Sequence, residues 1–302
     1  MNRFLYSLVL YFSIPFAIFR LLIKDTHDAS WTRKLKNQFG IVEKIPGRVI
    51  WTHCVSVGEF NASKPLIEKL MSQYPNHQIV ISTTTITGFN AVNNYYKNNV
   101  KHCFFPFDIP FILDSFIRKI NPEICILLET EIWPNLIHIL KKKNIPTALI
   151  NARLSAKSFQ RYDKYLSKLV KASLNNLSLI CTQNSFSSDR FISLGANQEK
   201  MITTGSLKFD SDNTIDDKSI KTLKKIIGER KITVFASTRE GEEKQIIKSY
   251  INSSDNINSL LIIIPRHPER FNEVFKLAKA SGLKVERRST ALQCSEDTDI
   301  LI

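Results

Sequence analysis

The segment Ser56-Val-Gly-Glu59 places a hydroxyl, a glycine and a carboxylate directly after the apolar run 49–55 and before a helical pattern. This order predicts a strand, a tight turn at Gly58 and a carboxylate at the mouth of a helix. Strand ends of this kind hold ligands in open α/β sheets. A carboxylate there can take a proton from a substrate hydroxyl when its surroundings tune its pKa. The simpler alternative is that Glu59 is a first-turn acid favoured by the helix dipole.

Two more acids, Glu129 and Glu131, follow the apolar stretch Ile-Cys-Ile-Leu-Leu and precede Pro134. Proline favours the first helical position, so the pattern again predicts a strand that leads into a helix. Residues two apart on an extended segment share a face, so both carboxylates are expected to converge on the crevice that holds Glu59. Clustered acids raise one another's pKa, which suits a general base. The alternative is that one acid caps the helix and the other faces solvent.

A hydroxyl-rich turn, Ser82-Thr-Thr-Thr-Ile-Thr-Gly88, follows another predicted strand and leads into a helix. Such a turn can bind an anion or a hydroxyl group. Thr84 and Thr85 are therefore predicted to contact substrate, as are Ser56 and Gly58. Ordinary capping of the next helix is the alternative for each threonine.

The second half of the chain has two loops that each join a strand to a helix and each carry an arginine, 237–243 and 265–270. Backbone N–H groups at a helix start, together with an arginine, form a phosphate site. Arg266 lies between a strand end and Pro268, so its side chain is expected to face the crevice. Lys208, in the polar segment before these loops, is predicted to add a third cation.

These residues need a scaffold, and the chain supplies one by alternating apolar runs with helical patterns. Runs without polar alternation are typical of parallel strands covered on both faces, so the fold class is α/β with doubly wound parallel sheets. The predicted strands lie at 49–55, 78–84, 101–105, 123–129, 146–151 and 177–182, and the predicted helices at 62–73, 88–96, 110–120, 134–143 and 158–173.

A polar, turn-rich stretch, 205–217, interrupts this rhythm and indicates a domain boundary. The alternation then restarts with strands at 231–237 and 260–264, helices at 241–251 and 268–280, and the beginning of a strand at 299–302. We therefore expect a membrane-anchor helix at 1–23, a Rossmann-like domain at 24–207 and a second, incomplete domain at 208–302.

The anchor is predicted from the apolar run 4–23, whose length is just enough for a membrane helix. A denser basic cluster follows the run than precedes it, which places the main domain on the cytoplasmic side. An amphipathic helix that lies on the membrane is the alternative to one that spans it.

Composition narrows the possible partners. The 302 residues carry a formal charge of +14, which suits a nucleic acid, an anionic membrane or a phosphorylated substrate. No interleaved aromatic and basic stripe supports nucleic acid. The 5 cysteines form no CxxC pair and the 6 histidines show no ligand spacing, so reduced thiols and no protein-built metal site are expected. The sequence contains no P-loop, strand-linked GxGxxG or GxSxG motif.

Taken together, the segments resemble the bacterial Kdo transferases, which attach 3-deoxy-D-manno-octulosonic acid (Kdo) to lipid A precursor. Each motif alone is weak, but their order along essentially the whole chain is specific. The motifs are HCVSVGEF at 53–60, STTTITG at 82–88, FPFDIP at 105–110, LLETEIWPNL at 127–136, INARLS at 150–155, GSLKFD at 205–210, STREGEE at 237–243 and IPRHPERF at 264–271.

The resemblance implies a GT-B architecture at the cytoplasmic face of the inner membrane. The first domain would bind lipid A precursor (lipid IVA), the second would bind CMP-Kdo, and transfer would proceed with inversion in lipopolysaccharide core biosynthesis. No cofactor and no protein-held metal are implied. By resemblance, Glu59 is the general base, and Glu129 and Glu131 support it. The implied CMP-Kdo contacts are Ser237, Thr238, Arg266 and His267.

Two departures from the family pattern matter. Arg239 stands where the family usually has histidine, which keeps a cation but loses proton transfer. The chain also ends at Ile302, before the glycine-rich GG-x-N-x-x-E segment of the family, so we expect a C-terminally truncated member. The alternatives are a non-catalytic remnant that binds membrane or lipid A, and a GT-B transferase for another sugar nucleotide. The sequence predicts no oligomeric state.

Overall fold

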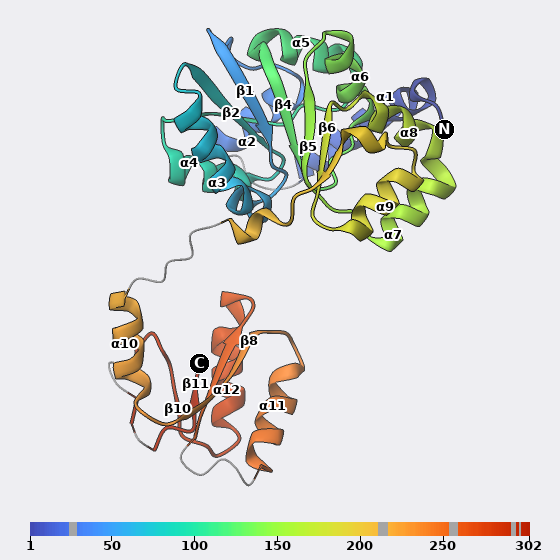
Figure 1. Ribbon diagram of the computed structural model, residues 1–302. Coiled ribbons are helices and arrows are strands. Elements are labelled where there is room, and N and C mark those ends of the chain that lie inside the picture. Colours follow the sequence, from blue (N-terminus) through green and yellow to red (C-terminus); the bar gives the residue numbers. More distant parts are fainter. Residues whose placement is uncertain (24–28, 211–216, 254–258, 291–293, 296) are drawn as a thin grey trace. The chain divides into compact units, whose positions relative to one another are not determined.

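The computed structural model (Figure 1) describes residues 1–23, 29–210, 217–253, 259–290, 294–295 and 297–302, with side chains described from residue 31 onward and up to residue 15. The chain divides into two compact units, Met1–Asp212 and Asn213–Ile302. The boundary predicted from sequence followed residue 207. Part of the turn-rich stretch that indicated it, 211–216, lies outside the described residues.

The first unit is built on a parallel sheet of seven strands in the order β3-β2-β1-β4-β5-β6-β7. β1 (Arg48–His53) lies beside β4 (Pro122–Leu128), and the chain winds outward from this pair in both directions. The carboxyl ends of β1 and β4 therefore flank the point where strand order reverses, which is where open α/β sheets bind ligands. The remaining strands are β2 (His77–Thr83), β3 (Lys101–Phe104), β5 (Thr147–Ala152), β6 (Leu179–Thr182) and β7 (Met201–Thr203).

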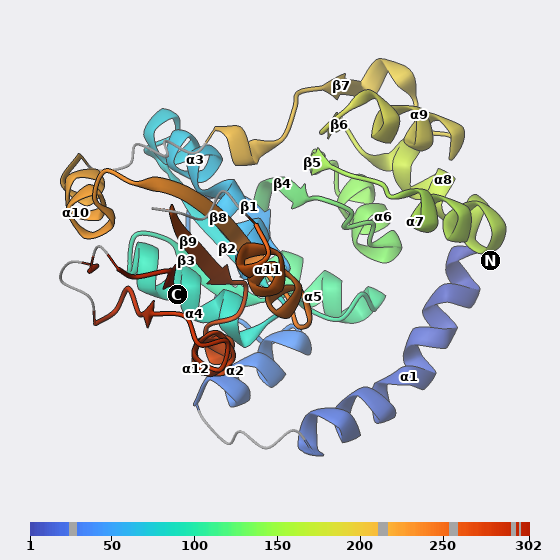
Figure 2. The same cartoon turned by 90° about the horizontal axis from the view of Figure 1, so that it is seen from below.

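Helices cover both faces of this sheet (Figures 1 and 2), because successive residues of a buried strand point to opposite sides. Trp51 packs on one face with α5, α6 and α8, whereas Ile50 packs on the other with α3 and α4. The helices are α1 (Arg3–Ile23), α2 (Ala29–Gln38), α3 (Val57–Gln73), α4 (Ile86–Tyr96), α5 (Pro110–Ile120), α6 (Pro134–Lys142), α7 (Ala156–Arg161), α8 (Ser167–Asn176) and α9 (Ser185–Ser193), with a π-helical turn, Tyr162–Leu166, between α7 and α8.

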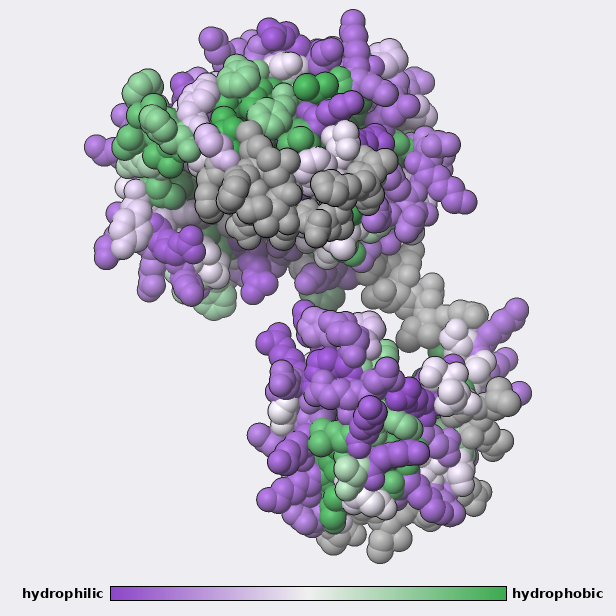
Figure 3. All heavy atoms as spheres, turned by 180° about the vertical axis from the view of Figure 1, so that it is seen from behind, coloured by the Kyte–Doolittle hydropathy of each residue, from purple (hydrophilic) through white to green (hydrophobic). Residues whose placement is uncertain are grey.

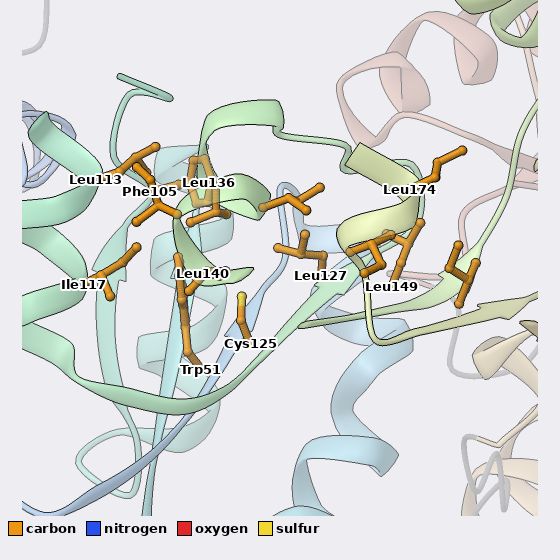
Figure 4. Close-up of a cluster of buried hydrophobic side chains, with 14 of the residues drawn as sticks. Trp51, Phe105, Leu113, Ile117, Cys125, Leu127, Leu136, Leu140, Leu149 and Leu174 are labelled. Carbon is orange, nitrogen blue, oxygen red and sulfur yellow. The ribbon is translucent and has the colours of Figure 1, made fainter. Parts of the chain in front are cut away.

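The larger core cluster joins the centre of the sheet to these helices (Figure 4). Trp51, Cys125 and Leu127 from the two central strands meet Leu136 and Leu140 from α6, and all five side chains are fully buried. Complete burial of a large apolar side chain contributes roughly 1.5–3 kcal/mol. This packing fixes β1 against β4 and thereby fixes the loops that follow them. The predicted α/β class and its central parallel strands are confirmed.

The N-terminal helix α1 is attached to the first unit by polar contacts. Tyr6 donates a hydrogen bond to Asp108 Oδ2 at 2.9 Å, and Ser7 donates to Asn135 Oδ1 at 3.0 Å. Asp108 also caps α6, because its Oδ1 accepts from the backbone N–H of Leu136 at 2.8 Å. Figure 2 shows α1 as a long helix at the edge of the unit. Over the described part of the chain, no helix has the length and hydropathy needed to cross a bilayer.

The second unit contains a parallel sheet of four strands in the order β10-β11-β9-β8. β8 is an edge strand, and Val234 and Phe235 on its two sides are 53% and 41% exposed. The elements are α10 (Asp217–Ile227), β8 (Lys231–Thr238), α11 (Glu242–Ile251), β9 (Ser259–Pro265), α12 (Phe271–Lys279), β10 (Val285–Glu286) and β11 (Ile300–Leu301).

Candidate functional site

Glu59 lies in the first turn of α3, directly after β1. Ser56 is the N-cap, and its Oγ accepts from the backbone N–H of Glu59 at 3.4 Å. The Glu59 carboxylate turns back and accepts from the backbone N–H of Val55 at 2.7 Å. This arrangement resembles a capping box, except that the Glu59 carboxylate bonds the N–H of Val55, the residue before the N-cap, and so ties the end of the strand to the start of the helix. Glu59 thus caps the helix and, in the same conformation, places its carboxylate at the end of the strand.

The tight turn predicted at Gly58 is wrong. α3 begins at Val57, five residues before the helix expected from the apolar pattern, so Gly58 lies within its first turn without a positive φ. An added Cβ would meet only Ser56 Oγ, at 3.8 Å. The change of direction is made instead by Ser56, whose backbone is extended.

The second pair of acids follows β4. Glu129 has φ +58°, so the chain bends here and the assumption of an extended Glu129–Glu131 segment is wrong. The bend is held by the Glu129 backbone N–H, which donates to the carbonyl of Ile150 on β5 at 3.0 Å. Glu131 then folds back, and its Oε2 accepts from Trp133 Nε1 at 2.7 Å.

The acids that follow the two strand ends are close enough for their charges to shift one another's pKa. The pKa of Glu131 is raised to about 7, mainly by burial and then by the charges of Glu59 and Glu129, while the hydrogen bond from Trp133 opposes the shift. Burial also raises the pKa of Glu59. The hydrogen bond from the Val55 N–H opposes this shift, and the charge of Glu129 adds to it. Glu59, Glu129 and Glu131 therefore form one group, called here the carboxylate cluster. The cluster forms because β1 and β4 are paired and end at the same edge of the sheet, as the sequence predicted.

The two threonines after β2 differ in their contacts. Thr85 is the N-cap of α4 and its Oγ1 accepts from the Gly88 N–H at 3.0 Å, so its side chain caps the helix. Thr84 donates its backbone N–H to the carbonyl of Val55 at 3.2 Å, which ties it to the loop that carries Glu59. Its Oγ1 is buried and has no partner among the described residues. Thr84 also lines an apolar cavity of about 200 Å³ beneath Trp133.

Lys208 belongs to the first unit, not to the second domain in which the sequence placed it. It lies in a short 3₁₀ turn, Leu207–Phe209, against α3. Leu207 packs into the core on the α3 side of the sheet, and its N–H donates to Asn151 Oδ1 at 3.2 Å. Lys208 itself is exposed, in the turn that contacts α3, the helix whose first turn carries Glu59.

The two loops predicted to bind phosphate lie side by side in the second unit, because β8 and β9 are paired. The Arg266 N–H donates to the carbonyl of Thr238 at 3.0 Å. Arg266 and His267 are exposed, and Ser237 has φ +62°. The loops thus place backbone groups and a cation on one edge of this sheet.

A buried ion pair that the sequence reading missed fixes these loops. Glu243 is 1% exposed; it accepts from Thr238 Oγ1 at 2.8 Å and from both terminal nitrogens of Arg270, at 2.8 and 3.1 Å. Burial alone would raise the pKa of Glu243, but the hydrogen bonds from Arg270 and Thr238 outweigh it and lower the pKa. The sequence does contain a signal for this pair, because Glu243 and Arg270 follow the ends of the adjacent strands β8 and β9 at the same spacing.

Across the described ranges, no three or more His, Cys, Asp or Glu side chains are placed to hold an ion. In the carboxylate cluster, Glu59 accepts from the Val55 N–H and the Ser56 hydroxyl, and Glu131 accepts from the Trp133 indole; all three are donors to an anion.

A parallel sheet with a ligand site at its switch point, followed by a second parallel α/β unit, defines a GT-B-like protein. Solved structures agree with this class. UDP-GlcNAc 2-epimerase from Neisseria meningitidis matches with a TM-score of 0.54 at 12% identity, over 84% of this chain and 71% of that one. A putative UDP-N-acetylglucosamine 2-epimerase from Listeria monocytogenes matches with a TM-score of 0.53 at 13% identity, over 84% and 68%. At these identities the likeness concerns the fold alone.

The family is defined by sequence. The model of the 3-deoxy-D-manno-octulosonic-acid transferase (kdotransferase) family matches residues 33–211. The 3-deoxy-D-manno-octulosonic acid transferase of Haemophilus influenzae is 36% identical over 311 residues, covering 100% of this chain and 72% of its own. A probable mitochondrial member from Arabidopsis thaliana is 31% identical, over 87% of this chain and 60% of its own. The chain belongs to the Kdo transferase family, as its motifs predicted.

The raised pKa of Glu131 predicts how stability depends on pH. A carboxyl that binds its proton more tightly in the folded state stabilises the fold at low pH and loses that contribution as pH rises from about 4.5 to 7. Glu131→Gln removes the titration and keeps an acceptor for Trp133. Relative to wild type, the variant should gain up to about 3 kcal/mol of unfolding free energy between pH 5 and pH 8.

Urea unfolding followed by tryptophan fluorescence measures this difference, since all 3 tryptophans, Trp31, Trp51 and Trp133, lie in the first unit. The same difference between variant and wild type at both pH values would contradict a shared, buried site for these acids.

Proposed function

We propose that this protein is an inverting glycosyltransferase that moves Kdo from CMP-Kdo to lipid A precursor (lipid IVA) in lipopolysaccharide core biosynthesis. The observation that carries the proposal is the carboxylate cluster at the switch point of a member of the Kdo transferase family. Transfer needs a base for the acceptor hydroxyl, because that oxygen must lose its proton as it bonds to the anomeric carbon. The bond from that carbon to the phosphate of CMP breaks in the same step, and CMP leaves as an anion.

Glu59 is the proposed general base, and Glu131 and Glu129 support it. Glu131 has a pKa of about 7 and so holds a proton for much of the time near neutral pH. A neutral neighbour leaves Glu59 free to be the ionised acid of the pair. The helix N-terminus and the Val55 N–H stabilise that charge, while burial keeps the carboxylate basic enough to accept a proton.

The donor is proposed to bind in the second unit. Ser237, Thr238 and Arg266 offer a hydroxyl, backbone groups and a guanidinium on one sheet edge, and His267 adjoins them. These are the groups that bind phosphate. Arg270 is paired with Glu243, so it holds the loops in place instead of offering its charge to the donor. Lys208 and Thr84 are proposed to contact the acceptor in the first unit.

Two alternatives to Kdo transfer from CMP-Kdo can be distinguished in the same transfer assay. A GT-B transferase for another sugar nucleotide would transfer a sugar from a donor other than CMP-Kdo, and the SVGE and ETEIWPN segments argue against it. A non-catalytic protein that only binds membrane or lipid A would show no transfer from CMP-Kdo under any condition.

The central test is Glu59→Gln. Loss of the base should lower the rate of Kdo transfer to lipid IVA by about 10²–10⁴-fold, the usual contribution of a positioned general base. The capping hydrogen bond of Val55 can be kept by the amide oxygen, so the fold should persist. Glu68→Gln is the matched control, since Glu68 is an exposed acid on the same helix and accepts a hydrogen bond from the Tyr95 hydroxyl. Transfer from radiolabelled CMP-Kdo at an unchanged rate in Glu59→Gln would refute the role.

Membrane attachment is proposed through an interfacial α1. Phe4, Leu8 and Phe12 repeat every four residues along one stripe of the helix and are 78%, 40% and 78% exposed. Tyr11 stacks on Phe111 of α5, which is 60% exposed and extends the apolar surface onto the domain. Figure 3 presents a face of the first unit on which hydrophobic side chains gather. A formal charge of +14 favours an anionic leaflet, such as the cytoplasmic face of the inner membrane.

Replacing both exposed phenylalanines of α1 tests this attachment. Phe4→Asp with Phe12→Asp should weaken binding to vesicles that contain anionic phospholipid at least about tenfold, because each phenylalanine contributes roughly 1.5–3 kcal/mol on burial. Neither phenylalanine takes part in the hydrogen bonds through which Tyr6 and Ser7 hold α1 on the first unit. Phe186→Asp on α9, where the ring is 71% exposed, is the control. Flotation of the double variant with vesicles at the wild-type level would contradict the proposal.

A further inference from the structure

His53 is the last residue of β1 and lies next to the carboxylate cluster, but no role for it was predicted from the sequence motifs. Its ring is fully buried and stacks on Phe105 with ring centroids 3.9 Å apart. Because His53 is directly opposite Ser82 in the β1–β2 register, its Nδ1 lies 3.1 Å from the Ser82 carbonyl oxygen and 3.0 Å from Ser82 Oγ.

The other ring nitrogen points at the cluster. His53 Nε2 has no hydrogen-bond partner among the described residues, and it lies 3.9 Å from Glu131 Oε2. A buried, unpaired ring nitrogen is costly, so this arrangement calls for a partner. Glu131 is the nearby group that can provide one, since its side chain is 20% exposed and lies on the loop between β4 and α6.

We propose that His53 is a positioning residue that offers Glu131 a neutral hydrogen-bond partner in both of its protonation states. When Glu131 is protonated, its hydroxyl donates to Nε2, and Nδ1–H donates to the Ser82 carbonyl. When Glu131 is ionised, Nε2–H donates to the carboxylate, and Nδ1 accepts from the Ser82 hydroxyl. The pair releases one proton to solvent between these states. The ring carries one N–H before and after, so it stays neutral.

Ser82 is what makes both states available. Its carbonyl can only accept, whereas its hydroxyl accepts from Trp51 Nε1 at 2.8 Å and keeps its own hydrogen to donate. Full burial lowers the pKa of His53 to about 3, which keeps the ring from becoming charged beside the acids. The titratable groups that face the pair are Glu59 on α3, Glu129 at the end of β4 and Tyr162 between α7 and α8.

The distance between Nε2 and Glu131 must shorten by about 1 Å to reach hydrogen-bond length. Catalytic contacts are often long before a ligand binds and tighten in the complex. The consequence for transfer rests on the proposed function. When Glu59 takes a proton from the acceptor, Glu131 can release one, and the charge of the cluster is conserved without a charged histidine.

The test is ¹⁵N NMR of the full 302-residue chain labelled at histidine, between pH 5 and pH 9. The His53 resonances should change from mainly Nδ1–H to mainly Nε2–H as Glu131 ionises near pH 7, with no imidazolium signal. Glu131→Gln should abolish the change. Ser82→Ala should hold the ring as Nδ1–H throughout, and Ser82→Thr, which keeps the hydroxyl, should restore the change.

His102 is a control within the same molecule. It is also buried and stacks on Phe89 with ring centroids 4.2 Å apart, and its pKa is lowered to about 3, mainly by burial. Among the residues that the structure describes, its Nδ1 has no hydrogen-bond partner. It should keep one tautomer over the whole pH range. A single His53 tautomer throughout, or the same change in Glu131→Gln, would overturn the proposal. Neither donor nor acceptor is present in the experiment, so its failure is distinct from failure of the proposed transfer.

Discussion

The pairing of β1 with β4 at the centre of the first sheet is the constraint on which the rest of the structure depends. His53 lies opposite Leu127, so the two strands end together and their following segments begin at one point. Large side chains such as Trp51, buried between the sheet and α5 and α6, hold the pair in register. Since a shift in register would separate the loops and turn buried side chains to the opposite face, the core and the site are stabilised by the same packing.

Gathering acids at this point costs free energy, and the surroundings offset the cost in two ways. Glu59 is stabilised as an anion by the start of α3 and by the Val55 N–H. Glu131 is buried against Trp133 and holds its proton up to about pH 7. Because their surroundings differ, Glu59 and Glu131 differ in how readily they ionise. Such a difference lets one carboxyl act as the base while its neighbour stays neutral. The second unit uses a different solution, a buried Glu243–Arg270 pair that leaves Arg266 exposed.

Continuous apolar runs were enough to predict the central strands, because burial on both faces leaves few other structures for them. Contacts between distant segments were harder to predict. The proposed role of His53 depends on Ser82, from the neighbouring strand β2, and on Phe105, which follows β3. The beginning of α3 at Val57 depends on reciprocal capping, and the apolar pattern does not start until later. Short polar helices such as α9, and the three-residue strand β7, carry too few apolar residues to be recognised.

The central claim is that the acids after β1 and β4 form a single coupled site. The most direct measurement is the titration of the Glu131 side-chain carboxyl by ¹³C NMR in wild type and in Glu59→Gln. If the cluster is coupled, Glu131 titrates near pH 7 in wild type, and its pKa falls when the charge of Glu59 is removed. The same Glu131 pKa in both proteins would contradict the claim, because it would mean that the two strand ends do not share a site.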